Sequence, residues 1–294
     1  MARTWLVTGC SSGLGQALAA AAAQAGHRVA ATARDPRTLT PLTSAWPEQI
    51  TPLTLDVRDP DQCAAAVTAA EQHLGAIDVL VNNAGGGLFG AVEEVGDEEL
   101  RGQFETLVAG PWRLIRLALP AMRARGAGHI LNISTTGARA PVPGLAAYLS
   151  CKQALDAMSV ALAAETAPFG IRVSVLEPGP FATNYGNALA ETAVRLPAYS
   201  AVANVLGMFR GMSDNPAIGN PEDYARTVLR LVETEPPTPL HVPIGPGAIE
   251  MLTAALEAAR TELAAAQTLT EPSAAPTPPP VASPSVVSAA SAGE

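Results

Sequence analysis

Short, almost wholly apolar runs alternate along the chain with longer stretches in which apolar residues recur at helical spacing. The short runs are typical of parallel strands buried on both faces, and the longer stretches are typical of amphipathic helices. The pattern predicts strands at Thr4–Thr8, Arg28–Ala33, Ile50–Leu55, Ile77–Val81, His129–Ser134, Arg172–Leu176 and His241–Ile244. It predicts helices at Leu14–Ala25, Asp61–Leu74, Glu98–Arg125, Ala147–Phe169, Glu222–Glu233 and Ala248–Gln267. With right-handed crossovers, this order gives an α/β fold that is doubly wound and three-layered.

Two segments depart from this alternation. Residues 184–220 mix Gly, Pro and apolar residues between a strand end and the next helix. An insertion at the carboxyl edge of a parallel sheet commonly covers a ligand crevice, so we expect a substrate lid at about 184–220. Residues 268–294 contain six Pro but no aromatic and no basic residue, and we expect them to form a disordered tail. Residues 1–267 are then expected to form a single domain.

Composition excludes several classes of protein. A net charge of −9 and scattered arginines argue against a nucleic-acid binder. The sequence contains no run of 18 apolar residues, so it predicts no membrane span. The N-terminal residues do not form a signal-peptide pattern, and three widely separated cysteines predict a reduced, cytoplasmic protein. The four histidines have no metal-site spacing. Of 18 basic residues only Lys152 is a lysine, which asks for an explanation.

A glycine-rich segment follows the first predicted strand and opens the first predicted helix. In Thr8-Gly9-x-x-x-Gly13-x-Gly15 the first glycine permits a tight turn, the second a close approach of backbone to a pyrophosphate, and the third close packing of helix on strand. Free N–H groups and the helix dipole favour a phosphate there. The alternative is an ordinary turn. In this context the segment predicts a dinucleotide site lined by Gly9, Ser11, Ser12, Gly13, Leu14 and Gly15.

The ends of the second and third strands suggest which dinucleotide is bound. Arg34 follows the second strand, and Ala33 occupies the place of the acidic residue expected beside a free ribose 2′-hydroxyl. An arginine suits a 2′-phosphate, so we expect NADP(H) rather than NAD(H), the alternative being a solvated Arg34. Asp56 and Val57 end the third strand and are expected to border the adenine, although Asp56 is nearly as well explained as a helix cap.

The lone lysine lies four residues after a tyrosine. Tyr148 and Lys152 therefore share one face of a predicted helix. A neighbouring ammonium favours the phenolate and is expected to lower the pKa of the tyrosine, making it usable as an acid or base near neutral pH. Arginine is a poor replacement because it is planar, bulkier and differently hydrated.

Four motifs together resemble the short-chain dehydrogenase/reductase family in order and spacing. They are Thr8–Gly15, Asn82-Asn83-Ala84-Gly85, Tyr148-x-x-x-Lys152 and Pro178-Gly179, and the similarity covers about residues 3–265. The resemblance implies a Rossmann fold with a mostly parallel seven-stranded sheet. It also implies a bound NAD(P)(H) and hydride transfer between the nicotinamide and a carbonyl or alcohol.

The resemblance also implies roles for individual residues. Tyr148 is expected to donate or accept the proton, and Lys152 to lower its pKa and hold the nicotinamide ribose. The family serine corresponds to Thr135, which keeps the hydroxyl. The remaining residues are expected to border the cofactor, with Thr183 at the carboxamide; they are Asn83, Ala84, Gly85, Pro178, Gly179 and Thr183.

One position departs seriously from the family pattern. The asparagine that links the lysine to solvent through water corresponds to Leu107, which cannot form that hydrogen bond. Three interpretations stay open. The protein is a working oxidoreductase with another water route; or it catalyses a non-redox cyclisation, dehydration or isomerisation; or it binds NADP(H) without turnover. The intact Tyr148–Lys152 pair favours the first.

The lid and the long helices suggest substrate and assembly. Apolar residues of the lid, together with Val142, Pro143 and Leu149, predict a pocket for a lipophilic carbonyl or alcohol. The alternative is that these side chains only pack the lid. The apolar lid residues are Tyr185, Leu189, Leu196, Tyr199, Met208, Phe209 and Met212. The resemblance implies a homodimer or homotetramer through the helices at 98–125 and 147–169. Cys151 is expected to be a buried filler rather than a nucleophile.

Overall fold

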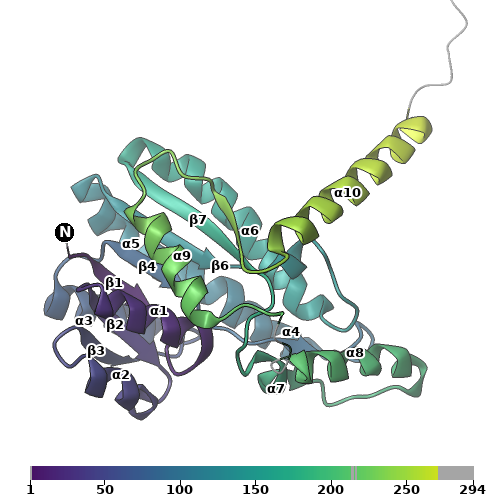
Figure 1. Ribbon diagram of the computed structural model, residues 1–294, viewed down its shortest axis with the longest axis horizontal. Coiled ribbons are helices and arrows are strands. Elements are labelled where there is room, and N and C mark those ends of the chain that lie inside the picture. The colour runs from purple at the N-terminus through teal and green to yellow at the C-terminus, as the bar shows by residue number, and fades with distance from the viewer. Residues whose placement is uncertain (1, 213–214, 216, 271–294) are drawn as a thin grey trace, which may run out of the picture. The chain divides into compact units, whose positions relative to one another are not determined.

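The computed structural model describes residues 2–212, 215 and 217–270 (Figure 1). One compact unit extends to Ala255, and a second begins at Leu256, inside the last helix. The tail expected at 268–294 lies outside the described residues from 271 onward. No helix in the described ranges is long and apolar enough to cross a membrane.

Seven strands form one sheet in the order β3-β2-β1-β4-β6-β7-β9, and every pairing in it is parallel. The strand order reverses between β1 and β4, where a doubly wound sheet opens a crevice at its carboxyl edge. The predicted fold class is confirmed. The strands are β1 Thr4–Val7, β2 Arg28–Ala33, β3 Ile50–Thr54, β4 Val79–Asn82, β6 Gly128–Ile133, β7 Ile171–Pro178 and β9 His241–Ile244.

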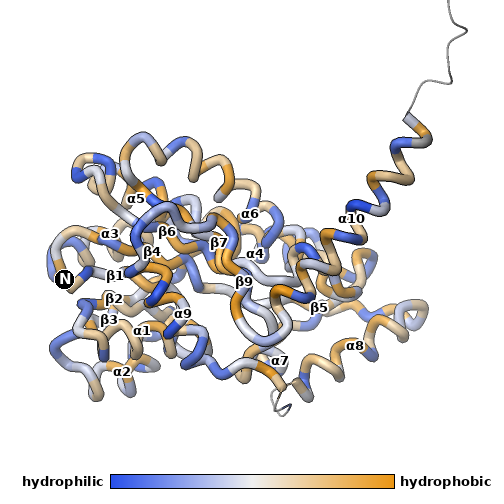
Figure 2. The backbone as a smooth tube through the Cα atoms, turned by 45° about the horizontal axis from the view of Figure 1, so that its top comes forward, coloured by the Kyte–Doolittle hydropathy of each residue, from blue (hydrophilic) through white to orange (hydrophobic). Residues whose placement is uncertain are grey.

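Alternating side chains of each strand enter two hydrophobic cores. In β1, Trp5 and Val7 belong to one core and Leu6 to the other, because successive residues of a strand point to opposite faces. Helices α1 (Gly13–Gln24) and α9 (Pro221–Glu233) pack together on the first face (Figure 1). Residues of α3 and α5 fill the second core, and Figure 2 shows hydrophobic residues gathered along the central strands.

All six predicted helices are present, with one correction. The segment predicted as one helix over Glu98–Arg125 is α4, then a π-helical turn at Glu105–Ala109, then α5. The sequence pattern also missed α2 and the short lid helices α7 and α8. The remaining helices are α2 Thr40–Ala45, α3 Pro60–Leu74, α4 Asp97–Phe104, α5 Gly110–Arg125, α6 Ala146–Thr166, α7 Tyr185–Ala188, α8 Ser200–Arg210 and α10 Ala248–Thr270.

Candidate active site

The glycine turn lies between β1 and α1 at the carboxyl edge of the sheet. Gly9 and Gly13 have φ angles of 71° and 61°, in the left-handed region that glycine favours. A Cβ on Gly15 would collide with the backbone oxygen of Gly9 and the amide of Asn83. Side chains would fill this cradle, so its bare backbone fits a pyrophosphate. Leu14 packs on the core, and two hydroxyls remain exposed at the turn, those of Ser11 and Ser12.

Hydrogen bonds join the glycine turn to the loop after β4. The Thr8 hydroxyl donates to the carbonyl of Val81 at 3.1 Å and accepts from the amides of Asn83 and Ala84, both at 2.9 Å. The side-chain amide of Asn83 donates back to the carbonyls of Thr8 and Gly9. Two of the predicted motifs are therefore one structural unit, and Asn83 supports the turn that faces the crevice.

A buried polar chain that the sequence analysis missed runs beneath this unit. Asn82 donates to Asn132 at 2.8 Å, Asn132 donates to Ser159 at 2.8 Å, and Ser159 donates to the Leu155 carbonyl at 2.6 Å. The chain links β4, β6 and α6, and it fixes the helix that carries Tyr148. An asparagine inside the apolar run of β6 is the sequence signal that points to it.

The outer end of the crevice contains two arginines with different surroundings. Asp56 is paired with Arg58, whose nitrogens approach its carboxylate to 2.6 Å. Asp59, not Asp56, caps α3 by accepting from two backbone amides, so the capping interpretation of Asp56 is wrong. Arg34 is exposed and makes no ion pair or hydrogen bond within the part of the chain that the structure describes. The pKa of Asp56 is lowered first by its hydrogen bond from Arg58 and further by the charge of Arg34, which lies at the end of β2.

Tyr148 and Lys152 both lie on the buried face of α6, as their spacing predicts. The Lys152 Nζ donates to the carbonyl of Ile133 at 2.5 Å and lies 5.6 Å from the centroid of the Tyr148 ring. Tyr148 is 9% exposed and belongs to a third apolar cluster, together with Phe89 and Leu107.

Burial dominates the protonation of this pair. It raises the pKa of Tyr148 to about 12 and lowers the pKa of Lys152 to about 8. The spacing alone led us to expect a lowered tyrosine pKa. In the structure, the loss of water around the phenol outweighs that effect, because a charged group is disfavoured where it is poorly solvated.

Three hydroxyls follow β6, and that of Thr136 donates to the Pro178 carbonyl at 3.4 Å. Thr135 is half-buried, and its Oγ1 accepts from the Gly137 amide at 3.2 Å. Ser134 is buried, and its hydroxyl has no partner among the described residues. Gly137 packs against Leu149, next to Tyr148 in the sequence, so the Thr135 loop lies against the start of α6.

Leu107 lies in the π-helical turn between α4 and α5. It is 1% exposed, and a Cβ on Gly85 would lie 2.6 Å from its Cδ2. The side chain therefore packs on the exposed loop that carries Asn83, Ala84 and Gly85. Isolated π turns are frequent at functional sites, and here the turn directs an apolar group to the place expected for an amide.

The end of β7 closes the crevice from the other side. Pro178 ends the strand, and the Gly179 amide donates to the Ile244 carbonyl of β9 at 2.9 Å. The chain then returns toward the glycine turn, since a Cβ on Gly13 would lie 3.6 Å from the Thr183 methyl group. Thr183 and Gly13 are 170 positions apart in the sequence and face each other here. The predicted binding residue Val57 is buried, three residues beyond the end of β3.

The lid is attached to the body by buried carboxylates. Strand β8 (Ala190–Glu191) pairs with β5 (Leu88–Phe89). Glu94 accepts from the amides of Ala91 and Leu196 and from Arg195, while Glu99 accepts from the Thr192 hydroxyl. Hydrogen bonds hold the pKa of both carboxyls below the usual range. They come from the Leu196 and Ala91 amides for Glu94, and from the Gly96 amide and the Thr192 hydroxyl for Glu99.

Part of the lid packs on Tyr148. The lid residues in its apolar cluster are Tyr185, Leu189, Val202, Val205, Leu206 and Phe209. Met208 is 72% exposed, and Tyr199 donates to Glu93 at the surface. Val142 and Leu149 also belong to the cluster. Tyr148 therefore has apolar surroundings, as predicted, but only some of the residues predicted for the pocket contribute to them.

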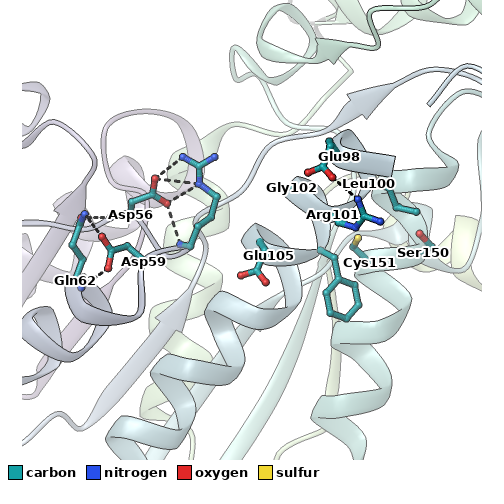
Figure 3. Close-up of a pocket in the computed structure, with 12 residues that line it drawn as sticks. Asp56, Asp59, Gln62, Glu98, Leu100, Arg101, Gly102, Glu105, Ser150 and Cys151 are labelled. Atoms are coloured by element: carbon teal, nitrogen blue, oxygen red, sulfur yellow. Dashed lines mark hydrogen bonds and ion pairs between the residues drawn. The ribbon is translucent and has the colours of Figure 1, made fainter. Parts of the chain in front are cut away.

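A cavity of about 1090 Å³ opens elsewhere, between the start of α3, α4 and α6 (Figure 3). Its lining is largely charged. Of the predicted site residues it includes Asp56 alone, and it reaches Cys151, which is buried, with a raised thiol pKa. The cavity therefore meets the apolar cluster of Tyr148 only through Cys151.

Comparisons with known proteins agree with this geometry. The sequence model of the short chain dehydrogenase family matches residues 3–193. "Oxidoreductase BOA17" of Botryotinia fuckeliana is 36% identical over 252 residues, covering 85% of this chain and 91% of that protein. Human 17-beta-hydroxysteroid dehydrogenase type 1 is 33% identical, with coverage of 81% and 76%.

Solved structures are similar as well. A short-chain dehydrogenase from Streptomyces avermitilis has a TM-score of 0.83 at 40% identity, covering 92% of this chain and 97% of its own. A 3-ketoacyl-(acyl-carrier-protein) reductase from Brucella melitensis, in complex with NADH, has a TM-score of 0.67 at 28% identity, with coverage of 78% and 90%. These findings support a nicotinamide cofactor. The chain belongs to the short-chain dehydrogenase family and is an oxidoreductase of that family.

Proposed function

We propose that the protein transfers a hydride between NADP(H) and a carbonyl or alcohol group of a lipophilic small molecule, with Tyr148 as the general acid or base. The observation that carries the proposal is the buried Tyr148–Lys152 pair, which faces an apolar cluster beside the glycine turn. Lys152 is only 5% exposed, and burial of its charge destabilises the folded state. A role in catalysis beside Tyr148 would explain why the lysine is buried there.

The cradle of Gly9, Gly13 and Gly15 would hold the pyrophosphate, and Arg34 would hold a 2′-phosphate. When bound, the nicotinamide supplies or accepts the hydride. Arg34 is free to pair with a phosphate, whereas the carboxylate of Asp56 is already occupied by Arg58. Tighter binding of NADPH than of NADH in calorimetry, reversed by Arg34→Asp, would support this assignment. Equal affinities would remove it.

In the direction of reduction, Tyr148 donates the proton. Its O–H bond breaks and the carbonyl oxygen becomes a hydroxyl. With its pKa raised to about 12, the phenol keeps its proton at neutral pH, which suits donation better than abstraction. The Lys152 ammonium, held by the Ile133 carbonyl, then favours the phenolate that remains. The Thr135 hydroxyl would hydrogen-bond the same carbonyl oxygen.

A lipophilic, uncharged substrate fits the lid. The arginines of the lid are paired internally: Arg195 with Glu94 and Glu191, and Arg210 with Glu191. They therefore offer no free cation to a carboxylate or phosphate. The apolar cluster around Tyr148 favours hydrocarbon instead. The similarity to a hydroxysteroid dehydrogenase supports the same class of substrate.

We also propose a cytoplasmic homodimer or homotetramer. Phe104 and Trp112 are 48% and 57% exposed, and they line an apolar groove that continues to Met158 of α6. Exposed aromatic residues around a groove are typical of an interface between protomers. Three free, buried cysteines support a reducing compartment. Sedimentation of the wild type and of Trp112→Glu would test the assembly.

The deciding experiment measures NADPH consumption and product mass across ketones of increasing size, including steroids. Turnover by the wild type that is lost in Tyr148→Phe supports the proposal, and unchanged turnover in that variant refutes the mechanism. Leu107 keeps a second candidate open, a non-redox reaction. A change in product mass without NADPH consumption would select it.

A further inference from the structure

A second tyrosine lies against Tyr148. Tyr185 begins α7, and its ring centroid is 6.0 Å from that of Tyr148, with the rings inclined at 52°. Its hydroxyl is buried and has no hydrogen-bond partner among the described residues. Buried hydroxyls are usually paired, so an unpaired one beside a reactive group requires an explanation.

The loop after β4 leaves room for this hydroxyl. A Cβ on Gly87 would lie 2.6 Å from the Tyr185 Oη, so a side chain at position 87 would displace it. Gly87 follows Gly85, on which Leu107 packs. The hydroxyl thus lies in the same apolar cluster as Tyr148 and Leu107, and its members carry no hydroxyl other than those of the two tyrosines.

The two phenols differ in how readily they ionise. Burial raises the pKa of Tyr185, and a charge on Tyr148 raises it further, so Tyr185 keeps its proton while Tyr148 is ionised. Conversely, the neighbouring Tyr185 phenol lowers the pKa of Tyr148 against the larger, opposite effect of burial. Three titratable groups lie around Tyr148: Lys152 and the Cys151 thiol from its own helix, and Tyr185 from α7. Leu107 and Phe89, packed on it from other elements, carry no charge.

We propose that Tyr185 is a positioning residue, whose hydroxyl donates a hydrogen bond to the Tyr148 oxygen and stabilises the phenolate. The inference rests on the proposed function and deepens it. When Tyr148 gives its proton to the substrate oxygen, Tyr185 retains its own O–H bond and turns it toward the new charge. It thereby supplies a polar partner in a cluster where Leu107 supplies none.

The test compares Tyr185→Phe with Tyr199→Phe. The first keeps the ring packed on Tyr148 and removes only the hydroxyl, and its fold is checked by thermal unfolding. The second removes a lid hydroxyl that bonds to Glu93 at the surface. For alcohol oxidation, we expect Tyr185→Phe to shift the rise of kcat/KM to higher pH by about one unit. The loss is then about tenfold at every pH below the pKa of Tyr148, whereas Tyr199→Phe follows the wild type.

A second readout needs no turnover. Fluorotyrosine incorporation gives one ¹⁹F signal for each of the four tyrosines and brings their titration to lower pH. The Tyr148 signal, assigned by its loss in Tyr148→Phe, should titrate at higher pH in Tyr185→Phe. An unshifted Tyr148 titration, or alcohol oxidation in Tyr185→Phe equal to that of the wild type, overturns the inference. A wild type without turnover would refute the proposed function, while the ¹⁹F titration still decides the role of Tyr185.

Discussion

Lys152 is expected to assist the reaction but to lower the free energy of unfolding. Its folded-state pKa is about 8, against 10.5 for an ordinary lysine. The unfolded chain therefore binds the proton more tightly than the folded protein. Between pH 8 and 10.5 the unfolded state carries more protons, so the contribution of Lys152 to the free energy of unfolding rises with pH in that window.

The magnitude follows from the shift. About 2.5 pKa units at about 1.4 kcal/mol each amount to roughly 3 kcal/mol of destabilisation at pH 7, where the ammonium is charged. Lys152→Met keeps the length of the side chain and removes the charge, but it also removes the bond to the Ile133 carbonyl, worth about 1 kcal/mol. The variant should therefore be about 2 kcal/mol more stable than the wild type at pH 7.

Urea unfolding between pH 7 and 11 measures this difference. Burial raises the thiol pKa of Cys63 to about 11 and that of Cys10 to about 12, and these groups make the stability of both proteins fall with pH. Because both proteins contain these cysteines, their effect cancels when the free energy of unfolding of the wild type is subtracted from that of Lys152→Met. The advantage of Lys152→Met should fall by about 3 kcal/mol from pH 8 to 10.5, from about 2 kcal/mol to about −1 kcal/mol, so that the wild type becomes the more stable protein. Reduction by the wild type should decline above pH 8, and the variant should be inactive.

A control and a refuting result complete the experiment. Lys152→Arg stays charged throughout the window, so its stability relative to Lys152→Met should not change with pH. If the gap between wild type and Lys152→Met is also constant, or if the methionine variant is the less stable at pH 7, the ammonium is not buried at a cost. The reasoning would then fail.

Three further predictions concern packing and the lid. Gly15→Ala should weaken nucleotide binding, measured by calorimetry, because its Cβ meets the Gly9 oxygen; Gly102→Ala, with open space at its Cβ, serves as control. Leu107→Asn should lower the free energy of unfolding in urea by about 3 kcal/mol, because an amide replaces a buried apolar group; unchanged stability would contradict the packing on Gly85. Glu94→Gln should accelerate proteolysis at residues 190–196 by weakening the bond to Arg195, whereas Glu98→Gln, on exposed α4, should not.

Within the central sheet, the sequence located the strands to within two residues of their ends, but it missed β5 and β8. The inner strands β1, β2, β4, β6 and β7 are largely buried on both faces, so their composition is set by solvent exclusion and can be recognised without partners. The π turn at Glu105–Ala109 left no such mark, because a single wide turn hardly changes helical periodicity. The capping role of Asp59 was likewise hidden, since Asp56 carries the same side chain three positions earlier.

Local sequence determined which groups stand near one another along a helix or turn. The spacing of Tyr148 and Lys152, and the glycines before α1, needed no tertiary information. Tertiary structure decided the energetics. Burial reversed the expected shift in the pKa of Tyr148, because solvation depends on residues distant in the chain. It brought Tyr185 to Tyr148 and Thr183 to Gly13, since chain segments far apart meet only when the sheet and lid have folded.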